Sequence, residues 1–310
     1  MNILITGGAG YLGSVMSGRL LEAGYHVTVI DNLLYRQHSL FHYCANENFD
    51  FVLGDARDEA LLRKHIKTAD VIIPLAAIVG APACDRDSGL ATTVNFDAIQ
   101  ALNRIRSSEQ LIVFPTTNSG YGTKSGDNFC TEETPLEPIS LYGKTKVQAE
   151  LELLGSPNVI TLRLATVFGM SPRMRMDLLV NNFTYAAFAF SYLVIFEKDF
   201  KRNFIHIRDV ADCVVHCIEN ATKMIGHPYN VGLDTANLSK EELALKIKEQ
   251  VPLFYLHFAP IGSDRDKRNY IVSNQKLAEA GFCAKRSLDG GIRELLKGFS
   301  MLGRGEFGNV

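Results

Sequence analysis

The stretch NILITGGAGYLGS (2–14) decides the fold, because Gly7, Gly10 and Gly13 stand between an apolar run and a segment with helical spacing. In a strand–turn–helix unit, the first glycine permits a tight turn and the second lets backbone N–H groups approach a pyrophosphate. The third lets helix and strand pack closely, and the positive end of the helix faces the phosphate. The pattern predicts a dinucleotide cradle, although an ordinary strand-end turn uses the same glycines.

Two acidic residues favour the cradle. Asp31 closes the next apolar run, HVTVID, 18 residues after Gly13, where the ribose of an adenosine would lie. A carboxylate there accepts hydrogen bonds from both ribose hydroxyls and repels a 2′-phosphate, so we expect NAD; Arg36, close by, leaves NADP open. Asp55 follows the third apolar run and is expected to meet the adenine edge. With all three features in register, we favour an NAD site over a plain turn.

Short β-branched runs alternate with helical segments along the first half of the chain. The expected strands are 2–6, 26–31, 49–55, 70–76, 110–117 and 158–165. The expected helices are 11–25, 59–69, 95–108 and 142–155, followed by 171–188 and 239–251 beyond the point where the alternation ends. Apolar strands joined by helices predict an α/β fold: a Rossmann-type doubly wound parallel sheet with a smaller, interleaved C-terminal α/β substrate lobe.

The expected division into domains follows from the point where the alternation of strands and helices ends. We assign residues 1–165 to an NAD-binding domain that 203–225 rejoins, and residues 166–202 and 226–310 to the substrate lobe.

Composition excludes several classes of protein. The chain has 310 residues, 46% of them apolar, with a net charge of −2, so nucleic acid is not an expected partner. The six cysteines form no CxxC pair, and no leader or membrane-length apolar stretch is evident, which predicts a soluble protein of the cytoplasm. His38, His42 and Cys44 lack a fourth ligand, so no metal site is predicted.

A second motif, LYGKTK, places Tyr142 and Lys146 four residues apart, on one face of a helix. A nearby ammonium and the positive nicotinamide ring would both favour the phenolate, making Tyr142 an acid/base, while Lys146 holds the nicotinamide ribose. Thr117 ends the fifth expected strand, where ligands of open α/β sheets bind, and its hydroxyl can share the substrate proton. Taken alone, this spacing is also common on solvated helix faces.

At this point the chain resembles the extended short-chain dehydrogenase/reductases that act on nucleotide sugars. The resemblance covers essentially the whole chain and keeps the order of the family's motifs. The matching segments are TGGAGYLG (6–13), DNL (31–33), GDARD (54–58), LAA (75–77), TTNSGYG (116–122), YGKTK (142–146), LRLATVFG (162–169) and RNFIHIRDVA (202–211).

The resemblance implies a catalytic trio of Thr117, Tyr142 and Lys146, and a homodimer paired through helices that begin near Phe96 and Tyr142. Asn95 is expected to support the lysine side of the site. Thr116 is grouped with the cofactor residues, or else only satisfies the strand end. The residues expected around NAD are Gly7, Gly10, Tyr11, Leu12, Gly13, Asp31, Asn32, Leu33, Asp55, Ala56, Leu75, Ala76, Ala77, Asn95, Thr116, Tyr142, Lys146 and Leu164.

Within that family, the residues after the catalytic hydroxyl indicate the reaction. The 4,6-dehydratases carry an Asp-Glu pair there, and the related 3,5-epimerases a cysteine nearby; this chain has Asn118 and Ser119, which disfavours both reactions. The segments SPRMRMDLLVNNFTY (171–185) and DKRNYIVSNQKL (266–277) most resemble the GDP-heptose 4-dehydrogenases of polysaccharide pathways. Compared with UDP-galactose 4-epimerases, Thr166 replaces an Asn and Val79 a Lys, which counts against UDP-glucose or UDP-galactose.

We therefore expect NAD-dependent oxidation of a nucleotide sugar, with a GDP-sugar favoured and a UDP-sugar as the alternative. Forked arginine donors suit a diphosphate, although each arginine could equally be a solvated surface residue. The candidates for contacting the substrate are Asn118, Ser119, Arg173, Arg175, Asn181, Arg202 and Arg268. A 4-epimerase with retained NAD, a 4-ketosugar reductase and a non-catalytic NAD sensor or scaffold remain competing interpretations.

Overall fold

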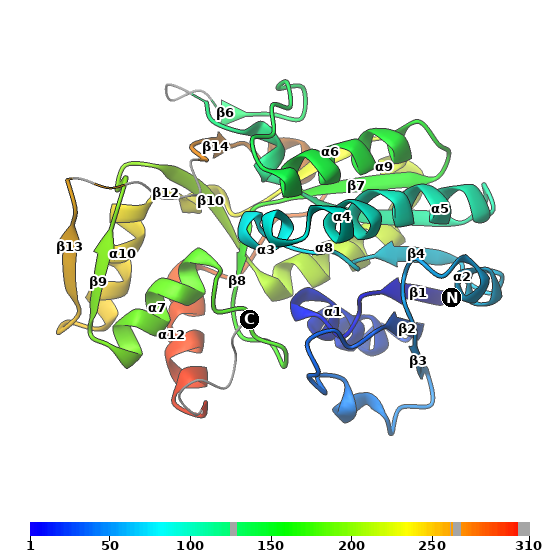
Figure 1. Ribbon diagram of the computed structural model, residues 1–310, viewed down its shortest axis with the longest axis horizontal. Coiled ribbons are helices and arrows are strands. Elements are labelled where there is room, and N and C mark those ends of the chain that lie inside the picture. The colour runs from blue at the N-terminus through cyan, green and yellow to red at the C-terminus, as the bar shows by residue number, and fades with distance from the viewer. Residues whose placement is uncertain (125–128, 261, 263–267, 303–310) are drawn as a thin grey trace.

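The computed structural model describes residues 1–124, 129–260, 262 and 268–302, so Asp266 and Lys267 of the segment DKRNYIVSNQKL lie outside the described residues. Figure 1 shows a large sheet with helices on both faces and, beside it, a smaller group of helices and short strands. We call these the large lobe and the small lobe.

The large lobe is built on a parallel seven-stranded sheet with the order β11-β7-β5-β4-β1-β2-β3. Its strands are β1 (Asn2–Thr6), β2 (His26–Asp31), β3 (Phe49–Leu53), β4 (Val71–Pro74), β5 (Leu111–Thr117), β7 (Val159–Leu164) and β11 (Pro228–Val231). The central strands are buried on both faces, which is why they appear as continuous apolar runs rather than alternating ones. The expected Rossmann-type fold is confirmed.

Helices cover both faces of this sheet, and each face has its own apolar core. On one side, Met16 and Leu20 of α1 pack with α8 against Ile3 and Ile5 of β1. On the other side, α2, α5 and α6 pack against the opposite faces of the same strands. These helices are α1 (Tyr11–Glu22), α2 (Glu59–Ile66), α5 (Ala98–Ile105), α6 (Leu141–Leu154) and α8 (Ile207–Glu219). The short helical pieces of this lobe are η1 (Phe41–Tyr43), α3 (Ala81–Arg86), α4 (Ser88–Thr92), η2 (Thr93–Asp97), η3 (Asn118–Tyr121) and α9 (Ala221–Met224).

The small lobe has its own core, in which Phe168, Phe204 and Phe254 are fully buried. Its helices are α7 (Leu179–Ala189), α10 (Lys240–Gln250), α12 (Leu288–Phe299) and the single turn η4 (Asp234–Ala236). The short helix α11 (Gln275–Glu279) belongs to the same part of the sequence but packs on the large sheet. Its strands form three small sheets, β12-β10-β8, β13-β9 and β14-β6. Their bounds are β6 (Phe129–Cys130), β8 (Thr166–Phe168), β9 (Tyr192–Ile195), β10 (Lys201–His206), β12 (Asn237–Ser239), β13 (Tyr255–Phe258) and β14 (Ile271–Val272).

Three features differ from the sequence expectations. β11, expected in the substrate lobe, is an edge strand of the large sheet, because it pairs with β7. β10, expected to rejoin the large lobe with α8, pairs with β8 and β12 of the small lobe instead. The expected helix 171–188 begins only at Leu179, and the residues before it cross toward the large lobe. The division into an NAD-binding domain and a substrate lobe stays a prediction, with these boundaries moved accordingly.

The strand order reverses between β1 and β4, since β2 and β3 lie on one side of this pair and β5, β7 and β11 on the other. In open α/β sheets the crevice at such a reversal, outside the carboxyl ends of the strands, is where ligands bind. Across the described part of the chain, no helix is both long and apolar enough to cross a bilayer.

Candidate active site

A cleft of about 1020 Å³ opens at the carboxyl ends of the strands, between the two lobes. The glycine turn after β1 and the helix pair of Tyr142 and Lys146 line the same cleft, together with Thr117 at the end of β5. The volume is at the upper end of the range for small-molecule sites and is large enough for two ligands side by side. Residues far apart in the sequence therefore meet in one cavity.

Steric contacts explain the glycines at Gly7 and Gly13. Gly7 has a φ of +74°, and a Cβ there would lie 2.5 Å from the backbone nitrogen of Ala76, after β4. A Cβ on Gly13 would lie 2.5 Å from the Cα of Gly8. Gly10 precedes the first residue of α1, and neither a side-chain cap nor an acidic residue occupies this helix end. The open N–H groups and the positive helix end can therefore receive a pyrophosphate, so the residues present fit a dinucleotide.

The two carboxylates expected near the adenosine also line the cleft. Asp31 is fixed by two backbone donors, because its carboxylate accepts hydrogen bonds from Ala9 N at 2.9 Å and Leu33 N at 2.8 Å. Asp55 forms an ion pair with Arg57 at 2.8 Å, and this partner holds the pKa of the Asp55 carboxyl at about 2. Both carboxylates are thus held in place before a ligand arrives.

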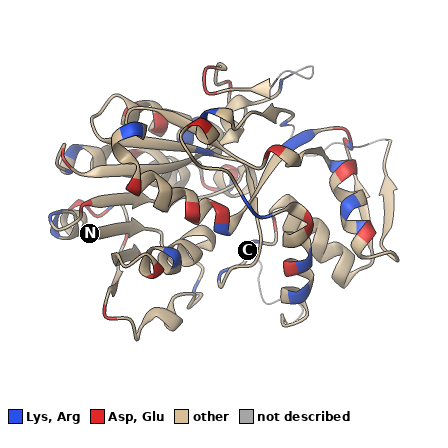
Figure 2. Ribbon diagram, turned by 180° about the vertical axis from the view of Figure 1, so that it is seen from behind, with Lys and Arg blue, Asp and Glu red and all other residues tan. Residues whose placement is uncertain are grey.

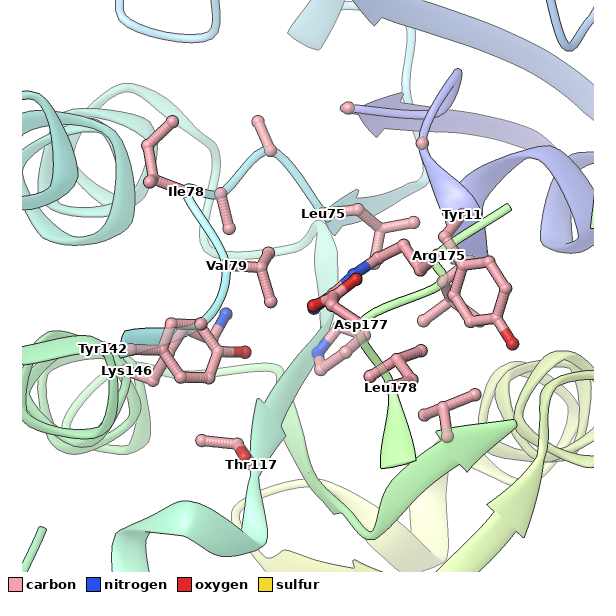
Figure 3. Close-up of a pocket in the computed structure, with 18 of the residues that line it drawn as sticks. Tyr11, Leu75, Ile78, Val79, Thr117, Tyr142, Lys146, Arg175, Asp177 and Leu178 are labelled. Atoms are coloured by element: carbon pink, nitrogen blue, oxygen red, sulfur yellow. The ribbon is translucent and has the colours of Figure 1, made fainter. Parts of the chain in front are cut away.

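The expected catalytic side chains gather at one end of the cleft (Figure 3). Ser140 caps α6 by accepting a hydrogen bond from Gly143 N at 3.1 Å, which fixes the helix start one residue before Tyr142. The hydroxyl of Thr117 donates to the hydroxyl of Ser119 at 2.9 Å. The Lys146 ammonium lies 3.9 Å from the centre of the Phe114 ring and is only 5% exposed.

Burial dominates the acid–base properties of this pair. It raises the pKa of the Tyr142 phenol above its ordinary value, and the charges of Arg175 and Arg268 oppose this. It also lowers the pKa of Lys146 to about 7, against the attraction of Glu150. The sequence predicted that a neighbouring ammonium lowers the phenol's pKa; here the two arginines are the main cations that do so. The ionisation of Tyr142 and Lys146 therefore depends on the charges that the cleft brings close to them.

An ion pair lies behind the lysine. Glu150 follows Lys146 by one helical turn, and its carboxylate accepts a hydrogen bond from Arg163 Nε on β7 at 2.7 Å. Both side chains are at most 5% exposed. Arg163 also donates to the Tyr121 hydroxyl at 3.2 Å and to the Glu132 carbonyl at 2.9 Å. Sequence reasoning missed this pair, although the i, i+4 spacing of Lys146 and Glu150 was a visible signal.

Three of the expected site residues do not line the cleft: Asn95, Asn118 and Asn181. Asn95 clamps the backbone of Ile78 instead, accepting from its N–H at 2.8 Å and donating to its carbonyl at 2.9 Å. Asn118 is 1% exposed beneath the loop that follows Thr117. Asn181 is fully buried and donates to the hydroxyl of Tyr11 at 3.2 Å and to the carbonyl of Arg175 at 2.9 Å. Asn95 and Asn181 therefore act on the site indirectly, by holding residues that line the cleft: Ile78 in one case, Tyr11 and Arg175 in the other.

Tyr11 joins the two lobes at the glycine turn. Its hydroxyl donates to the carbonyl of Gly169, the residue after β8, at 2.7 Å, and burial raises its pKa. Its own carbonyl accepts a hydrogen bond from the Ser171 hydroxyl at 2.8 Å. The segment 169–178 of the small lobe is thereby attached to the start of α1.

The four expected arginines lie at different points of the cleft. Arg173 stacks on Tyr35, on the side of Asp31, and Arg175 forms an ion pair with Asp177 at the centre (Figure 3). Arg202 lies 5.6 Å from the Tyr270 ring centre, and Arg268 hydrogen-bonds Ser119 beside Thr117. Among the cleft residues that sequence reasoning missed are Tyr35, Asp177, Lys240 and Tyr270. No local motif marks them, because tertiary packing brings them here.

Figure 2 shows acidic and basic residues interspersed along the helices of both lobes, in keeping with the net charge of −2.

Comparisons with known proteins identify the family of this chain. The model of the NAD-dependent epimerase/dehydratase family matches residues 3–232. The chain is 32% identical over 269 residues to YtcB of Bacillus subtilis, an uncharacterised protein named as a UDP-glucose epimerase, with 80% of this chain and 79% of that one covered. It is 28% identical over 326 residues to the UDP-glucose 4-epimerase of Yersinia pestis, covering 93% of this chain and 94% of that one.

Solved structures share the fold over almost the whole chain. The UDP-glucose 4-epimerase of Thermotoga maritima, solved with UDP-glucose, superposes with a TM-score of 0.85 at 25% identity, covering 97% of this chain and 99% of that one. The UDP-glucuronic acid 4-epimerase of Bacillus cereus, in complex with UDP-glucuronic acid and NAD, gives a TM-score of 0.85 at 24% identity, covering 98% of this chain and 100% of that one.

The glycine turn, Asp31 and the Thr117, Tyr142 and Lys146 side chains, which line one cleft, all lie within the part of the chain that the family model matches. The chain belongs to the NAD-dependent epimerase/dehydratase family, the nucleotide-sugar branch of the extended short-chain dehydrogenase/reductases.

Proposed function

We propose that this enzyme oxidises the C4 hydroxyl of a GDP-hexose or GDP-heptose with NAD, as a 4-dehydrogenase in the synthesis of polysaccharide precursors. The observation that carries the oxidation step is the meeting of Thr117, Tyr142 and Lys146 with the glycine turn in one cleft. The preference for C4 and for a GDP-sugar comes from the resemblance of 171–185 and 266–277 to GDP-heptose 4-dehydrogenases.

In this proposal Tyr142 removes the proton of the sugar hydroxyl, and Thr117 shares that proton through its own hydroxyl. Arg175 and Arg268 favour the phenolate that the step requires, since their charges lower the pKa of Tyr142. Lys146 holds the nicotinamide ribose with its ammonium. A bound NAD⁺ would supply the acceptor for the hydride of the carbinol carbon, and Tyr142 would take the hydroxyl proton as the alcohol becomes a ketone.

The two positions that follow Thr117 carry no carboxylate for a subsequent dehydration. Asn118 lies outside the cleft lining, and Ser119 is engaged by Thr117 and Arg268. Neither an amide nor a hydroxyl is a proton-transfer group of the kind a carboxylate provides near neutral pH. The ketosugar is therefore the expected product.

Three cations on the small-lobe side of the cleft would hold the substrate diphosphate. Arg202, Lys240 and Arg268 line this side together with Tyr270. Arg202 and Lys240 are at most 3% exposed, so they act at low dielectric, where charge recognition is strong. We extend the proposal to a protein of the cytoplasm that forms a homodimer through α5 and α6.

A second candidate is a 4-epimerase that keeps its NAD and reduces the ketone again from the opposite face. The names of relatives favour it: YtcB and the Yersinia pestis protein are both named as UDP-glucose epimerases. The two candidates share the oxidation step and differ in whether the reduced cofactor returns its hydride to the same sugar.

A panel of GDP- and UDP-sugars separates these candidates. Purified enzyme is mixed with each sugar, NADH absorbance is followed, and the sugar product is identified by mass spectrometry and NMR. A 4-dehydrogenase gives NADH and a ketosugar lighter by two hydrogens; an epimerase gives an isomer of unchanged mass and no net NADH.

Tyr142→Phe is the control, and it should lower turnover by roughly 10²–10⁴-fold while bound NAD is kept. Protein with neither bound NAD(H) nor turnover of any sugar would contradict the proposal.

A further inference from the structure

Tyr35 and Arg173 contact each other across the cleft, from opposite lobes. Tyr35 lies in the loop after β2, four residues beyond Asp31, whereas Arg173 belongs to the segment between β8 and α7. The guanidinium carbon of Arg173 is 4.2 Å from the centre of the Tyr35 ring, which is the geometry of a cation–π contact. Both residues line the cleft together with Asp31.

The small-lobe half of this contact is firmly held. Arg173 is only 3% exposed, and its Nη1 donates to the carbonyl of Met174 at 2.7 Å. Its backbone N–H donates to the Ser171 hydroxyl at 3.2 Å, and Ser171 in turn is bonded to Tyr11 at the glycine turn. The guanidinium is therefore positioned relative to the cofactor cradle and not merely lying on the surface.

The loop of the large lobe that carries Tyr35 has an unusual backbone conformation. Leu33 and Arg36, on either side of Tyr35, have φ values of +53° and +52°, a region that non-glycine residues rarely adopt. Their N–H groups close short turns, Leu33 on the Asp31 carboxylate at 2.8 Å and Arg36 on the Leu33 carbonyl at 2.8 Å. Such strain persists only where surrounding contacts impose it, and it directs this loop toward the cleft.

Charge also places Arg173 at the adenosine end. Arg173 and Asp31 attract each other, and Asp31 is the residue placed for the adenosine ribose. Arg175, two residues later, lies at the centre of the cleft instead, between Tyr11 and Leu75 (Figure 3). The segment thus extends along the cofactor side of the cleft, which favours a cofactor role for Arg173 over the expected contact with the substrate.

We propose that Arg173 and Tyr35 form a clasp over the adenosine end of the NAD site, which slows the release of the bound cofactor. The ligand is the adenosine moiety of NAD: it carries a flat π-system and a ribose, which suit a guanidinium, a phenol ring and the Asp31 carboxylate. For the cofactor to leave, the contact between the lobes has to open. The clasp rests on NAD as the cofactor and not on the identity of the sugar.

The dissociation rate of NADH tests the clasp directly and needs no sugar. Enzyme loaded with NADH is mixed with excess NAD⁺, and the loss of bound NADH fluorescence is followed. We expect Arg173→Met and Tyr35→Leu each to raise the dissociation rate roughly three- to thirtyfold, the range of a partly desolvated cation–π contact. The double variant should dissociate little faster than either single variant, because the two side chains act as one unit.

Tyr35→Phe is the matched control. It keeps the ring face and loses only the hydroxyl, so its NADH dissociation rate should stay within about twofold of wild type.

Two results would overturn the clasp. One is NADH dissociation from both Arg173→Met and Tyr35→Leu at the wild-type rate. The other is Arg173→Met with an unchanged NADH dissociation rate but weakened binding of GDP or UDP in calorimetry, which would make Arg173 a substrate residue. Neither result depends on which nucleotide sugar is the substrate, so a failure of the clasp and a failure of the proposed function are distinguishable.

Discussion

Replacing Glu150 by Gln should reveal how the ion pair behind Lys146 supports the site. The variant keeps the shape of the side chain but removes the partner that lies 2.7 Å from Arg163 in a fully buried position. Removing one member of such a pair leaves an uncompensated buried charge and costs about 3–5 kcal/mol. With an unfolding entropy of about 0.65 kcal/mol/K for a chain of 310 residues, the melting temperature should fall by about 5–8 °C.

The same substitution should change the pH dependence of the reaction. Burial lowers the pKa of Lys146 to about 7, and the attraction of Glu150 is what opposes this. Without that charge the pKa of Lys146 falls further, so the ammonium is lost at a lower pH. Activity that needs the ammonium is present below the pKa of Lys146 and disappears as pH rises through it. The alkaline limb of kcat/KM should therefore move to lower pH by about one unit, the lower end of the effect of a nearby opposite charge, because Arg163 already offsets part of it.

Thermal melts and pH–rate profiles of the wild type and a set of variants check this reasoning. Thr161→Val is the matched control, since Thr161 donates to the same carboxylate at 3.4 Å but carries no charge. It should leave the alkaline limb in place. The double variant Glu150→Met with Arg163→Met should melt above either single variant, because it buries no unpaired charge. An alkaline limb that stays fixed or moves to higher pH in Glu150→Gln would refute the electrostatic role, even if the protein were less stable.

Two further predictions concern the cofactor cradle. Asp31→Asn should lower the preference for NADH over NADPH by roughly tenfold in fluorescence titrations, because it removes the charge that repels a 2′-phosphate; an unchanged ratio of dissociation constants would show that Asp31 does not select the cofactor. Gly13→Ala should lower the melting temperature by several degrees and weaken NAD binding, since its Cβ would lie 2.5 Å from the Cα of Gly8, whereas Gly89→Ala, with its nearest contact at 3.6 Å, should do neither. Equal melting temperatures for the two alanine variants would show that the backbone at the turn can move apart.

Most strands and helices of the large lobe could be predicted because the residues that define each of them are neighbours in the sequence. β1 and β2 have the bounds expected from their apolar runs, 2–6 and 26–31, and β1 is buried at every position after its first residue. β11 was missed because it has only four residues, begins with Pro228 and is a strand only through its pairing with β7. The start of α7 was misplaced for a related reason: residues 171–178 have helical spacing, but Pro172 and the contacts of Ser171 with Tyr11 hold them in another path.

The same distinction separates the two halves of the site. The glycine turn and the Tyr142–Lys146 spacing were visible because each depends on neighbours a few residues away. Tyr35, Arg163 and Lys240 were not, since their positions depend on contacts between distant segments: Asn181 and Tyr11, for example, are 170 residues apart and share one hydrogen bond. Local patterns could therefore identify the cofactor cradle, while the small-lobe residues that would hold the sugar nucleotide depend on how the two lobes pack. Substitutions in segment 169–178 should for this reason affect cofactor retention and substrate preference together, because one stretch of backbone carries Arg173 beside Tyr35 and Arg175 at the centre of the cleft.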